Sequence, residues 1–514
     1  MKHSVGPAVA KKPAVMLGAV RLTIGDIADV ADGRRSIIFS ETAEAHIEAS
    51  ARTLASLSAA GERIYGVTTG LGAAVDTALQ ADDDVQMRVP LARCVGVGRT
   101  SSRRELRAII ATRAARLAWG YSGASLAAAR GLAALIERDI RPVMPMTGSI
   151  GEGDLAPLAA IAAVLTGQGF ATRDGEIISG AVALEHAGLA PLRLVGKDGL
   201  ALVSSNAASV GLAVLCVADA RHMLSAAVAA GALSFEAYRC SLNPISEAAL
   251  ALRPLPGQQA AAGAMRALLE GGTLVQPGAA RRLQDPLSFR CIAPVMGAAA
   301  AALDAACDIV EAELNSSDDN PAILAEGLSL PNANFDTTHL TLTFETLGLA
   351  LARIAAMVGE RIMKLMSPAS SDLPRFLSPI QNGRNGYATV QKTVAALVAE
   401  IQYRANPMPV FVLPVADRVE DYATMATAVV EKTADIVTRL RLLIAVELMV
   451  AAQAVDLREG IALGRGTAGV QAAVRGAVAM LTEDRPATPD IEALNAMIAA
   501  GAFDVFGGIG EGAK

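Results

Sequence analysis

Long stretches rich in alanine and leucine dominate the second part of the chain. These stretches lie at about residues 200–235, 286–315, 340–366, 386–404 and 419–454. Helices of this length bury most of their sides only when they pack together in a bundle, often across subunits. Hydrophobic residues make up 52% of the chain and aromatic residues only 3%, so small aliphatic side chains must fill the core. The sequence therefore predicts a mainly α-helical protein.

The segment before this bundle has a different character. Residues 1–20 contain two prolines and no periodic pattern, which is typical of a flexible tail. Shorter helical patterns and loops rich in glycine follow. We therefore predict a flexible N-terminal tail at 1–20, an N-terminal domain at 21–198, and a central and C-terminal helical bundle at 199–514.

Charge and cysteine usage exclude several classes of protein. With 45 Lys and Arg against 51 Asp and Glu, the chain has no basic surplus for binding nucleic acid. Its five cysteines form no Cys-x-x-Cys pair and its five histidines are scattered, so we expect a reducing compartment and no metal site. The start of the chain lacks the apolar stretch of a signal peptide, and serine and asparagine interrupt the longest charge-free run, Gly199 to Ala218. We therefore expect a cytoplasmic protein without a membrane partner.

Three polar segments interrupt these apolar surroundings. They are Tyr65–Gly72, Thr147–Leu158 and Gln284–Arg290. Polar groups in an apolar neighbourhood are typical of functional sites. The three glycines of the first segment allow backbone conformations that other residues avoid, and they present Tyr65 on a loop. Each segment taken alone is also explained as a turn with helix caps.

Together and in this order, the segments resemble the histidine and aromatic amino acid ammonia-lyase family. The resemblance covers almost the whole chain. It also includes Gly96-Val97-Gly98, Gly120-Tyr121-Ser122-Gly123, Gly199-Leu200-Ala201-Leu202, Asp319-Asn320-Pro321, Asn334-Phe335, Glu360-Arg361 and Glu420-Asp421. It implies a mainly α-helical fold with a smaller N-terminal domain and a long central helical bundle. It further implies a homotetramer whose active sites combine residues of several subunits.

One loop departs from the family in a way that affects the chemistry. Family members form an electrophilic methylidene-imidazolone from an internal Ala-Ser-Gly tripeptide, whereas residues 151–154 of this chain read Gly-Glu-Gly-Asp. No serine remains there to dehydrate, and Ser149 is followed by Ile150, which does not match the cyclising unit. We therefore predict that the methylidene-imidazolone does not form and that the protein uses no cofactor.

Elimination without this electrophile suits a substrate whose nitrogen is already quaternary. Trimethylamine leaves such a substrate as a neutral molecule once a base removes the neighbouring β-proton. Histidine betaines fit this description, and the ergothionase branch of the family, which lacks the prosthetic group, converts ergothioneine to thiourocanate and trimethylamine. On these mechanistic grounds the chain looks like that branch. We expect a small-molecule amino acid or betaine as substrate, with ergothioneine as the first candidate.

Two alternatives stay open. The first is an ordinary histidine or aromatic amino acid ammonia-lyase, or an aminomutase, that activates its substrate in another way. The second is a catalytically inactive homologue that serves as a scaffold. The presence of both Tyr65 and Arg290 argues against a scaffold, which has no use for a base and a carboxylate clamp.

The resemblance assigns roles to four residues that match the family. Tyr65 matches the catalytic base at the β-carbon, and Arg290 matches the arginine whose planar fork binds the substrate carboxylate. Glu420 matches a glutamate close to the substrate nitrogen, where it would hold a trimethylammonium group. An ordinary glutamate on a helix surface is an equal alternative. Phe335 matches a phenylalanine of the pocket, although core packing is the default interpretation of an aromatic residue.

Five further candidates stand where this chain differs from the usual lyases. Arg93 occupies a position that contacts the substrate ring and would suit a thione or thiolate, unless it faces outward before a tight turn. Ser204 aligns with the family's asparagine, and Asn206 is close by as a substitute donor. Lys392 is a second cationic contact or a proton donor, or else a surface lysine. Glu152 takes the place of the prosthetic group and orients the cation, acts as acid or base, or stabilises a helix dipole.

Overall fold

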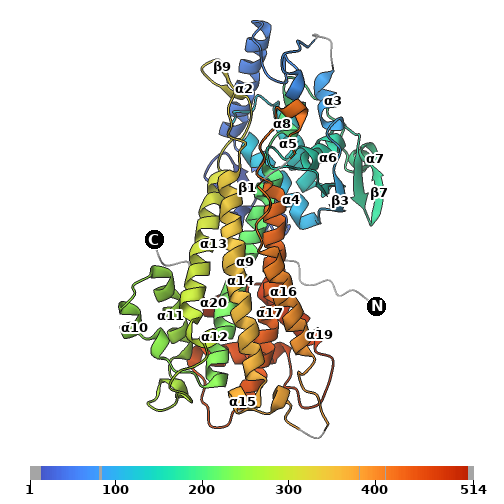
Figure 1. The fold of residues 1–514 in the computed structure, drawn as a ribbon. Coiled ribbons are helices and arrows are strands. Elements are labelled where there is room, and N and C mark those ends of the chain that lie inside the picture. The colour runs from blue at the N-terminus through green and yellow to red at the C-terminus, as the bar shows by residue number, and fades with distance from the viewer. Residues whose placement is uncertain (1–12, 80–83, 381–382, 411–412, 508–514) are drawn as a thin grey trace. The chain divides into compact units, whose positions relative to one another are not determined.

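The computed structural model describes residues 13–79, 84–380, 383–410 and 413–507 (Figure 1). The chain divides into two compact units, each assembled from three segments. Unit 1 comprises Met1–Leu215, Cys307–Leu342 and Met408–Glu431, and unit 2 comprises Cys216–Ala306, Thr343–Pro407 and Lys432–Lys514. Most described residues are helical, so the prediction of a mainly α-helical protein is confirmed.

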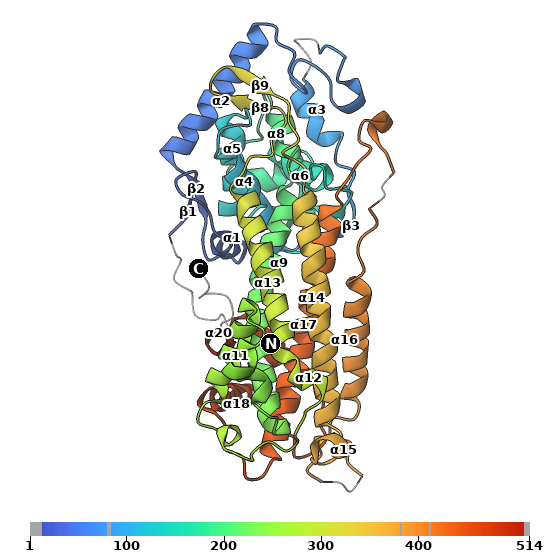
Figure 2. The same ribbon diagram turned by 60° about the vertical axis from the view of Figure 1, so that its left-hand side comes forward.

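Four long helices contain residues of both units. They are α9 (Ala207–Tyr238), α13 (Ile292–Leu314), α14 (Thr338–Leu365) and α17 (Ala426–Asp456). With α16 (Val390–Arg404) they account for the five stretches that the alanine-rich pattern predicts. In unit 2 these helices lie side by side as a bundle (Figures 1 and 2). The remaining helices of unit 2 are α10 (Glu247–Ala251), α11 (Pro256–Leu269), α12 (Leu287–Arg290), α15 (Pro368–Ser371), α18 (Arg465–Ala477), α19 (Thr488–Ala499) and α20 (Asp504–Gly507).

Unit 1 adds shorter helices and small sheets. Its helices are α1 (Ile24–Ala31), α2 (Glu41–Ala59), α3 (Val85–Leu91), α4 (Arg103–Leu117), α5 (Leu126–Glu137), α6 (Leu155–Leu165), α7 (Gly180–His186) and α8 (Asp198–Val203). Its strands are β1 (Val15–Leu17), β2 (Ile37–Phe39), β3 (Val97–Thr100), β4 (Arg141–Pro142), β5 (Pro145–Thr147), β6 (Phe170–Arg173), β7 (Glu176–Ser179), β8 (Ala322–Leu324) and β9 (Leu328–Leu330). Strands β1 and β2 pair in parallel, and β3–β5, β4–β6–β7 and β8–β9 form antiparallel sheets.

Side chains at the helix ends explain where several helices of unit 1 begin. α4 starts after Ser102, whose Oγ accepts a hydrogen bond from the Glu105 backbone N–H (3.2 Å). The Glu105 carboxylate in turn accepts one from the Ser102 backbone N–H (2.7 Å), which completes a capping box. The rest of α4, from Leu106 to Leu117, is buried, so this helix forms the centre of unit 1.

The structure differs from the expected organisation in two places. Strand β1 lies within the segment 1–20 that we expected to be a flexible tail, because Val15 and Leu17 are buried and the strand pairs with β2. Residues 1–12 of that segment lie outside the described residues. The chain passes from unit 1 to unit 2 at 215–216, near the expected boundary at 198–199, but two later segments return to unit 1.

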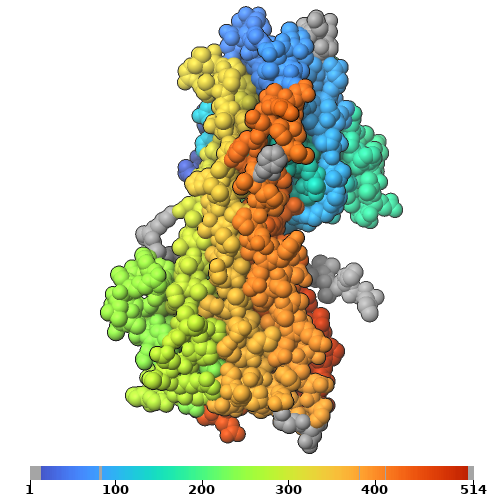
Figure 3. Space-filling view, in the orientation of Figure 1, coloured from blue at the N-terminus to red at the C-terminus, as the bar shows by residue number. Residues whose placement is uncertain are grey.

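Three helical stretches are long and apolar enough to cross a membrane by length and composition alone. They are Asp198–Tyr238, Ile292–Leu314 and Thr338–Leu365. The most apolar window of the first is 94% buried, which is the environment of a core helix. The corresponding windows of α13 and α14 are only 50% and 44% buried, so both helices leave apolar side chains exposed. Both helices reach the surface on the face that Figure 3 shows.

Candidate active site

The loop that carries Glu152 is fixed by hydrogen bonds to its backbone. The Gly151 carbonyl accepts hydrogen bonds from the hydroxyls of Thr337 and Thr424, both at 3.0 Å. These two threonines belong to segments far away in the sequence, and their Oγ1 atoms lie 2.9 Å apart. Because both hydroxyls converge on one carbonyl, Glu152 projects from a backbone that is held in place.

Asp154 anchors the same loop at the start of α6. Its carboxylate is fully buried and accepts hydrogen bonds from Ser149 Oγ (2.6 Å), the Ser209 backbone N–H (2.6 Å) and Thr427 Oγ1 (2.8 Å). Burial raises the pKa of Asp154, while these hydrogen bonds oppose the shift. The loop is therefore tied to α9 and α17 as well as to α6.

Gly151 itself is a position where a side chain does not fit. Its φ of +88° lies in the left-handed region, and an added Cβ would lie 2.3 Å from Thr424 Oγ1 and 2.6 Å from the Ala426 backbone nitrogen. We expect Gly151→Ala to destabilise the protein by about 1–3 kcal/mol and to lower activity, measured as thermal unfolding and turnover. The matched control is Gly175→Ala, with a similar φ of +87° and nothing within 4 Å. Equal losses in both variants would show that backbone strain alone, not the contact with Thr424, is responsible.

Asn206 connects this loop with two other segments of unit 1. Its side-chain carbonyl accepts a hydrogen bond from the Gly153 backbone N–H (2.9 Å), and its side-chain N–H donates to the Phe335 carbonyl. Its backbone N–H donates to Asp318 (2.6 Å), a fully buried carboxylate paired with Arg116 of α4. Both ends of the Asn206 amide are thus used by the protein, which makes this residue a brace of the site. Its role as a substrate donor stays a prediction.

Tyr65 stands on a tight loop that orients its phenol. The Tyr65 side chain is half-buried, and its Oη accepts a hydrogen bond from the Gly72 backbone N–H (2.9 Å). Gly66 has a φ of +70°, and a Cβ there would lie 2.6 Å from Leu71 and from Leu200. Gly66, which directly follows Tyr65, is therefore required by the close packing of this loop.

Arg93 lies within electrostatic range of Tyr65 and Glu420. Burial lowers the pKa of the Arg93 guanidinium, and the charges of Tyr65 and Glu420 oppose this shift. Arg93 Nη1 donates a hydrogen bond to the Val89 carbonyl (3.2 Å) near the end of α3. The structure thus brings together three residues that the sequence places in one site.

Several carboxylates surround Glu152. Burial, followed by the charge of Asp336 and more weakly those of Glu420 and Asp154, raises the pKa of Glu152 to about 8. A hydrogen bond from the Thr424 backbone opposes this shift. Glu152 Oε1 is buried and has no hydrogen-bond partner within the described part of the chain. The surroundings of Glu152 therefore favour a positively charged ligand.

Asp336 is a residue that the sequence analysis missed. It directly follows Phe335, and its carboxylate accepts hydrogen bonds from the backbone N–H (3.0 Å) and hydroxyl (3.1 Å) of Thr338. Phe335 is half-buried, and Ser204, also half-buried, ends α8 with its Oγ near Gly153. The only sequence signal for Asp336 is its place after the Asn334-Phe335 motif.

Two predicted site residues belong to unit 2. Arg290 is half-buried on α12, where its Nη1 donates a hydrogen bond to Gln284 Oε1 (2.6 Å). Lys392 is exposed near the start of α16. The other seven predicted residues all lie in unit 1. Unit 1 thus holds the predicted base and cation-binding groups, and unit 2 holds the predicted carboxylate clamp.

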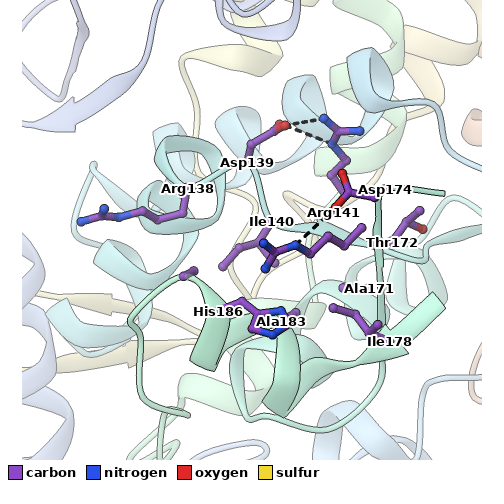
Figure 4. Close-up of a pocket in the computed structure, with 12 residues that line it drawn as sticks. Arg138, Asp139, Ile140, Arg141, Ala171, Thr172, Asp174, Ile178, Ala183 and His186 are labelled. Atoms are coloured by element: carbon purple, nitrogen blue, oxygen red, sulfur yellow. Dashed lines mark hydrogen bonds and ion pairs between the residues drawn. The ribbon is translucent and has the colours of Figure 1, made fainter. Parts of the chain in front are cut away.

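A pocket of about 350 Å³ in unit 1 contains none of the predicted site residues (Figure 4). Four of its charged wall groups form two pairs: Arg141 Nε lies 3.1 Å from Asp139, and Arg173 Nε lies 3.6 Å from Asp174. This pocket therefore contributes nothing to the candidate active site. Within the described ranges, no three His, Cys, Asp or Glu side chains form a group that could hold a metal ion.

Comparison with known proteins identifies the family. The model of the aromatic amino acid lyases matches residues 22–476. The histidine ammonia-lyase of Sorangium cellulosum (strain So ce56) is 36% identical over 497 residues, which cover 94% of this chain and 96% of that protein. The chain belongs to the aromatic amino acid lyase family. It is a carbon–nitrogen lyase with the ammonia-lyase fold, as the sequence predicts.

Two solved structures of related proteins are similar to this lyase over nearly their full length. Ergothionase from Treponema denticola, an ergothioneine-degrading enzyme solved in complex with desmethyl-ergothioneine sulfonic acid, is 31% identical with a TM-score of 0.88. The match covers 95% of this lyase and 99% of that chain. Tyrosine aminomutase from Streptomyces globisporus is 29% identical with a TM-score of 0.90, over 96% and 98% of the two chains.

The usual prosthetic group of this family does not fit the residues of this lyase. In place of its Ala-Ser-Gly tripeptide the loop carries only Glu152-Gly153, neither of which can lose water to form the methylidene. The nearby hydroxyl, that of Ser149, donates a hydrogen bond to Asp154 and accepts one from the Gly151 N–H (3.1 Å).

Proposed function

We propose that this lyase eliminates trimethylamine from a histidine betaine, ergothioneine first, without a methylidene-imidazolone or any other cofactor. The observation that carries the proposal is Glu152, a half-buried carboxylate whose Oε1 is buried, in place of the electrophile, with Asp336 and Glu420 in electrostatic range. Mutual repulsion among these carboxylates is relieved by a cationic nitrogen. The missing electrophile favours a quaternary nitrogen, which leaves as a neutral amine. Similarity to the Treponema denticola ergothionase supports the same substrate class.

In the proposed reaction, Tyr65 as a phenolate removes the β-proton of the substrate. The C–H electron pair forms the Cα=Cβ double bond, the C–N bond breaks, and trimethylamine leaves with that bond's electrons. The Gly72 N–H lies 2.9 Å from Tyr65 Oη, where it orients the phenol oxygen, and the positive charge of Arg93 is in electrostatic range of the same residue. The leaving amine needs no proton, so this step requires only one base.

Binding uses the remaining residues. Arg290 holds the substrate carboxylate, Arg93 contacts the thione or thiolate of the ring, and Phe335 packs against that ring. Glu152 and Glu420 hold the trimethylammonium group through charge alone, since it has no N–H to donate. Ser204 and Asn206 line the site, and Lys392 supplies a second cationic contact.

We further propose that the lyase works as a cytoplasmic homotetramer. The exposed apolar sides of α13 and α14 are suited to contacts with other copies of the chain. None of the five cysteines, all of which lie within the described residues, forms a disulfide, which suits a reducing compartment.

A second candidate function is that of a histidine ammonia-lyase. The observation that favours it is the 36% identity to the Sorangium cellulosum protein of that name, against 31% to ergothionase. This reaction would release ammonia and would need another way to activate the amino group.

The deciding experiment incubates the purified lyase with ergothioneine, hercynine, histidine and tyrosine in parallel. Acrylate absorbance and the released amine are followed, and the intact mass is recorded on the same sample. We expect trimethylamine from a betaine and no loss of water from the protein mass. Ammonia release from histidine or tyrosine would contradict the betaine proposal and support the second candidate.

A further inference from the structure

Arg290 stands on α12, a helix of a single turn in unit 2. Four residues form too few hydrogen bonds to fix the orientation of such a helix, so its direction depends on neighbouring elements. The contacts of the residues just before Arg290 therefore decide where its guanidinium points.

Aromatic packing holds one side of this turn against α9. The Phe289 side chain is fully buried and stacks on Tyr238, with ring centroids 4.3 Å apart and an interplanar angle of 23°. Phe235 approaches the Phe289 ring edge-on, with the ring centroids 6.1 Å apart. In the preceding segment, Asp285 accepts a hydrogen bond from the Ser241 backbone N–H (2.7 Å). These contacts fix the position of the turn on α9.

A buried arginine holds the backbone of the same turn. Arg361 of α14 donates a hydrogen bond from Nη1 to the Ser288 carbonyl (3.1 Å). Its Nε and Nη2 donate to the two carboxylate oxygens of Glu447 of α17, at 2.6 and 2.9 Å. Ser234 Oγ adds a hydrogen bond to Glu447 (2.8 Å). Arg361 and Glu447 are both fully buried.

A buried ion pair of this kind is not explained by stability alone. Well-packed apolar residues of similar volume are often at least as stable as a buried pair, because the pair loses its hydration. The bidentate contact with Glu447 does fix the plane of the Arg361 guanidinium, and this plane directs Nη1 at the Ser288 carbonyl.

We infer that Arg361, oriented by Glu447, is a positioning residue for Arg290 and so for recognition of the substrate carboxylate. The inference rests on the proposed function, in which Arg290 binds that carboxylate. Neither Arg361 nor Glu447 is required to touch the substrate. Their effect reaches Arg290 through the Ser288 carbonyl, because Ser288 lies two residues before Arg290 on the same helical turn. A small shift of that backbone would move the guanidinium out of bidentate range.

The test compares two ligands that differ only in the carboxylate. They are thiourocanate and its decarboxylated vinyl counterpart, and their dissociation constants are measured by calorimetry on the full-length protein. In the double variant Arg361→Met/Glu447→Leu, both charges leave together, so neither is stranded in the core. We expect the affinity for thiourocanate to fall by up to about 100-fold, while that for the vinyl ligand stays unchanged. Equal losses for both ligands, or no loss for either, would overturn the inference.

Three further variants keep the test decisive. Arg361→Lys keeps a charge for Glu447 but has no planar fork, so it should weaken thiourocanate binding selectively even if the double variant does not fold. Thr467→Val removes another buried hydroxyl of unit 2, one bonded to Glu236, and should leave both affinities unchanged. Arg290→Met is the reference and should lose affinity only for thiourocanate. If Arg290→Met does not lose affinity for thiourocanate, the assigned role of Arg290 fails together with this inference. If Arg290→Met loses that affinity but the Arg361 variants do not, only the inference fails.

Discussion

Replacement of Tyr65 by phenylalanine is expected to lower kcat by about 10²–10⁴-fold in a protein that still folds. The ring keeps its half-buried place, so packing on the loop is preserved, while the oxygen that takes the β-proton is lost. The Gly72 N–H loses its acceptor, which costs about 1 kcal/mol of stability and leaves the fold intact. Turnover is measured by acrylate absorbance with the best substrate, and thermal unfolding is measured on the same sample.

The matched control for this experiment is Tyr403→Phe. Tyr403 lies on α16 with 76% of its surface exposed, so its hydroxyl has no part in the proposed chemistry. We expect the control to turn over at the wild-type rate. Unchanged turnover in Tyr65→Phe would mean that another group removes the proton. If the substitution changed no measurable activity and no ligand affinity, the inactive-scaffold alternative would gain support.

The second large effect concerns pH and Glu152. With a pKa of about 8, Glu152 is mostly protonated in the free protein at neutral pH. A trimethylammonium ligand prefers the ionised carboxylate, so its affinity should rise with pH and level off above about pH 8. Each pH unit below the pKa is worth at most about tenfold, so the rise between about pH 6 and about pH 8 should be about 50-fold. Glu152→Gln should bind weakly at every pH without this slope. Calorimetric titration with an unreactive betaine checks both expectations.

The same shift predicts how stability depends on pH. Between the usual glutamate value of 4.5 and about 8, the folded protein keeps a proton on Glu152 that the unfolded chain has released. The free energy of unfolding should therefore fall as the pH rises through this window, and Glu152→Gln should reduce that fall.

Glu236 provides the control for the affinity measurement. Its carboxylate is buried in unit 2, accepts hydrogen bonds from the Gly464 N–H and the Thr467 hydroxyl, and has a pKa raised to about 7 by burial. Glu236→Gln should alter the pH dependence of stability but leave that of betaine affinity unchanged. A flat affinity profile in the wild type, or a slope that survives in Glu152→Gln, would contradict the cation-binding role of Glu152.

Much of the fold follows from local sequence patterns. The alanine-rich stretches predict α9, α13, α14, α16 and α17 to within about two turns. A long apolar helix can be recognised from its own composition and periodicity, without knowledge of the segments that pack against it. The strand β1 escaped prediction because three residues are too few to show a period, and its burial depends on β2. Residues 307–342 and 408–431 belong to unit 1 again, and the composition of the sequence does not predict this.

The candidate site follows from the sequence only in part, for a similar reason. Tyr65, Arg93, Arg290, Phe335 and Glu420 stand in motifs that the family resemblance places by position. Asp336 and the bracing role of Asn206 lie outside such motifs. Their significance comes from contacts with segments more than a hundred residues away, such as that between Asn206 and Phe335.

The sequence by itself determined the helical class, the family and the loss of the serine needed for the usual electrophile. Each of these follows from which residues are present and in what order. Only the tertiary structure decided that Glu152 stands among carboxylates, that Thr337 and Thr424 hold its loop, and that Arg361 reaches the turn of Arg290. Burial, charge repulsion and hydrogen-bond direction depend on distances between segments, and those distances exist only once the chain has folded.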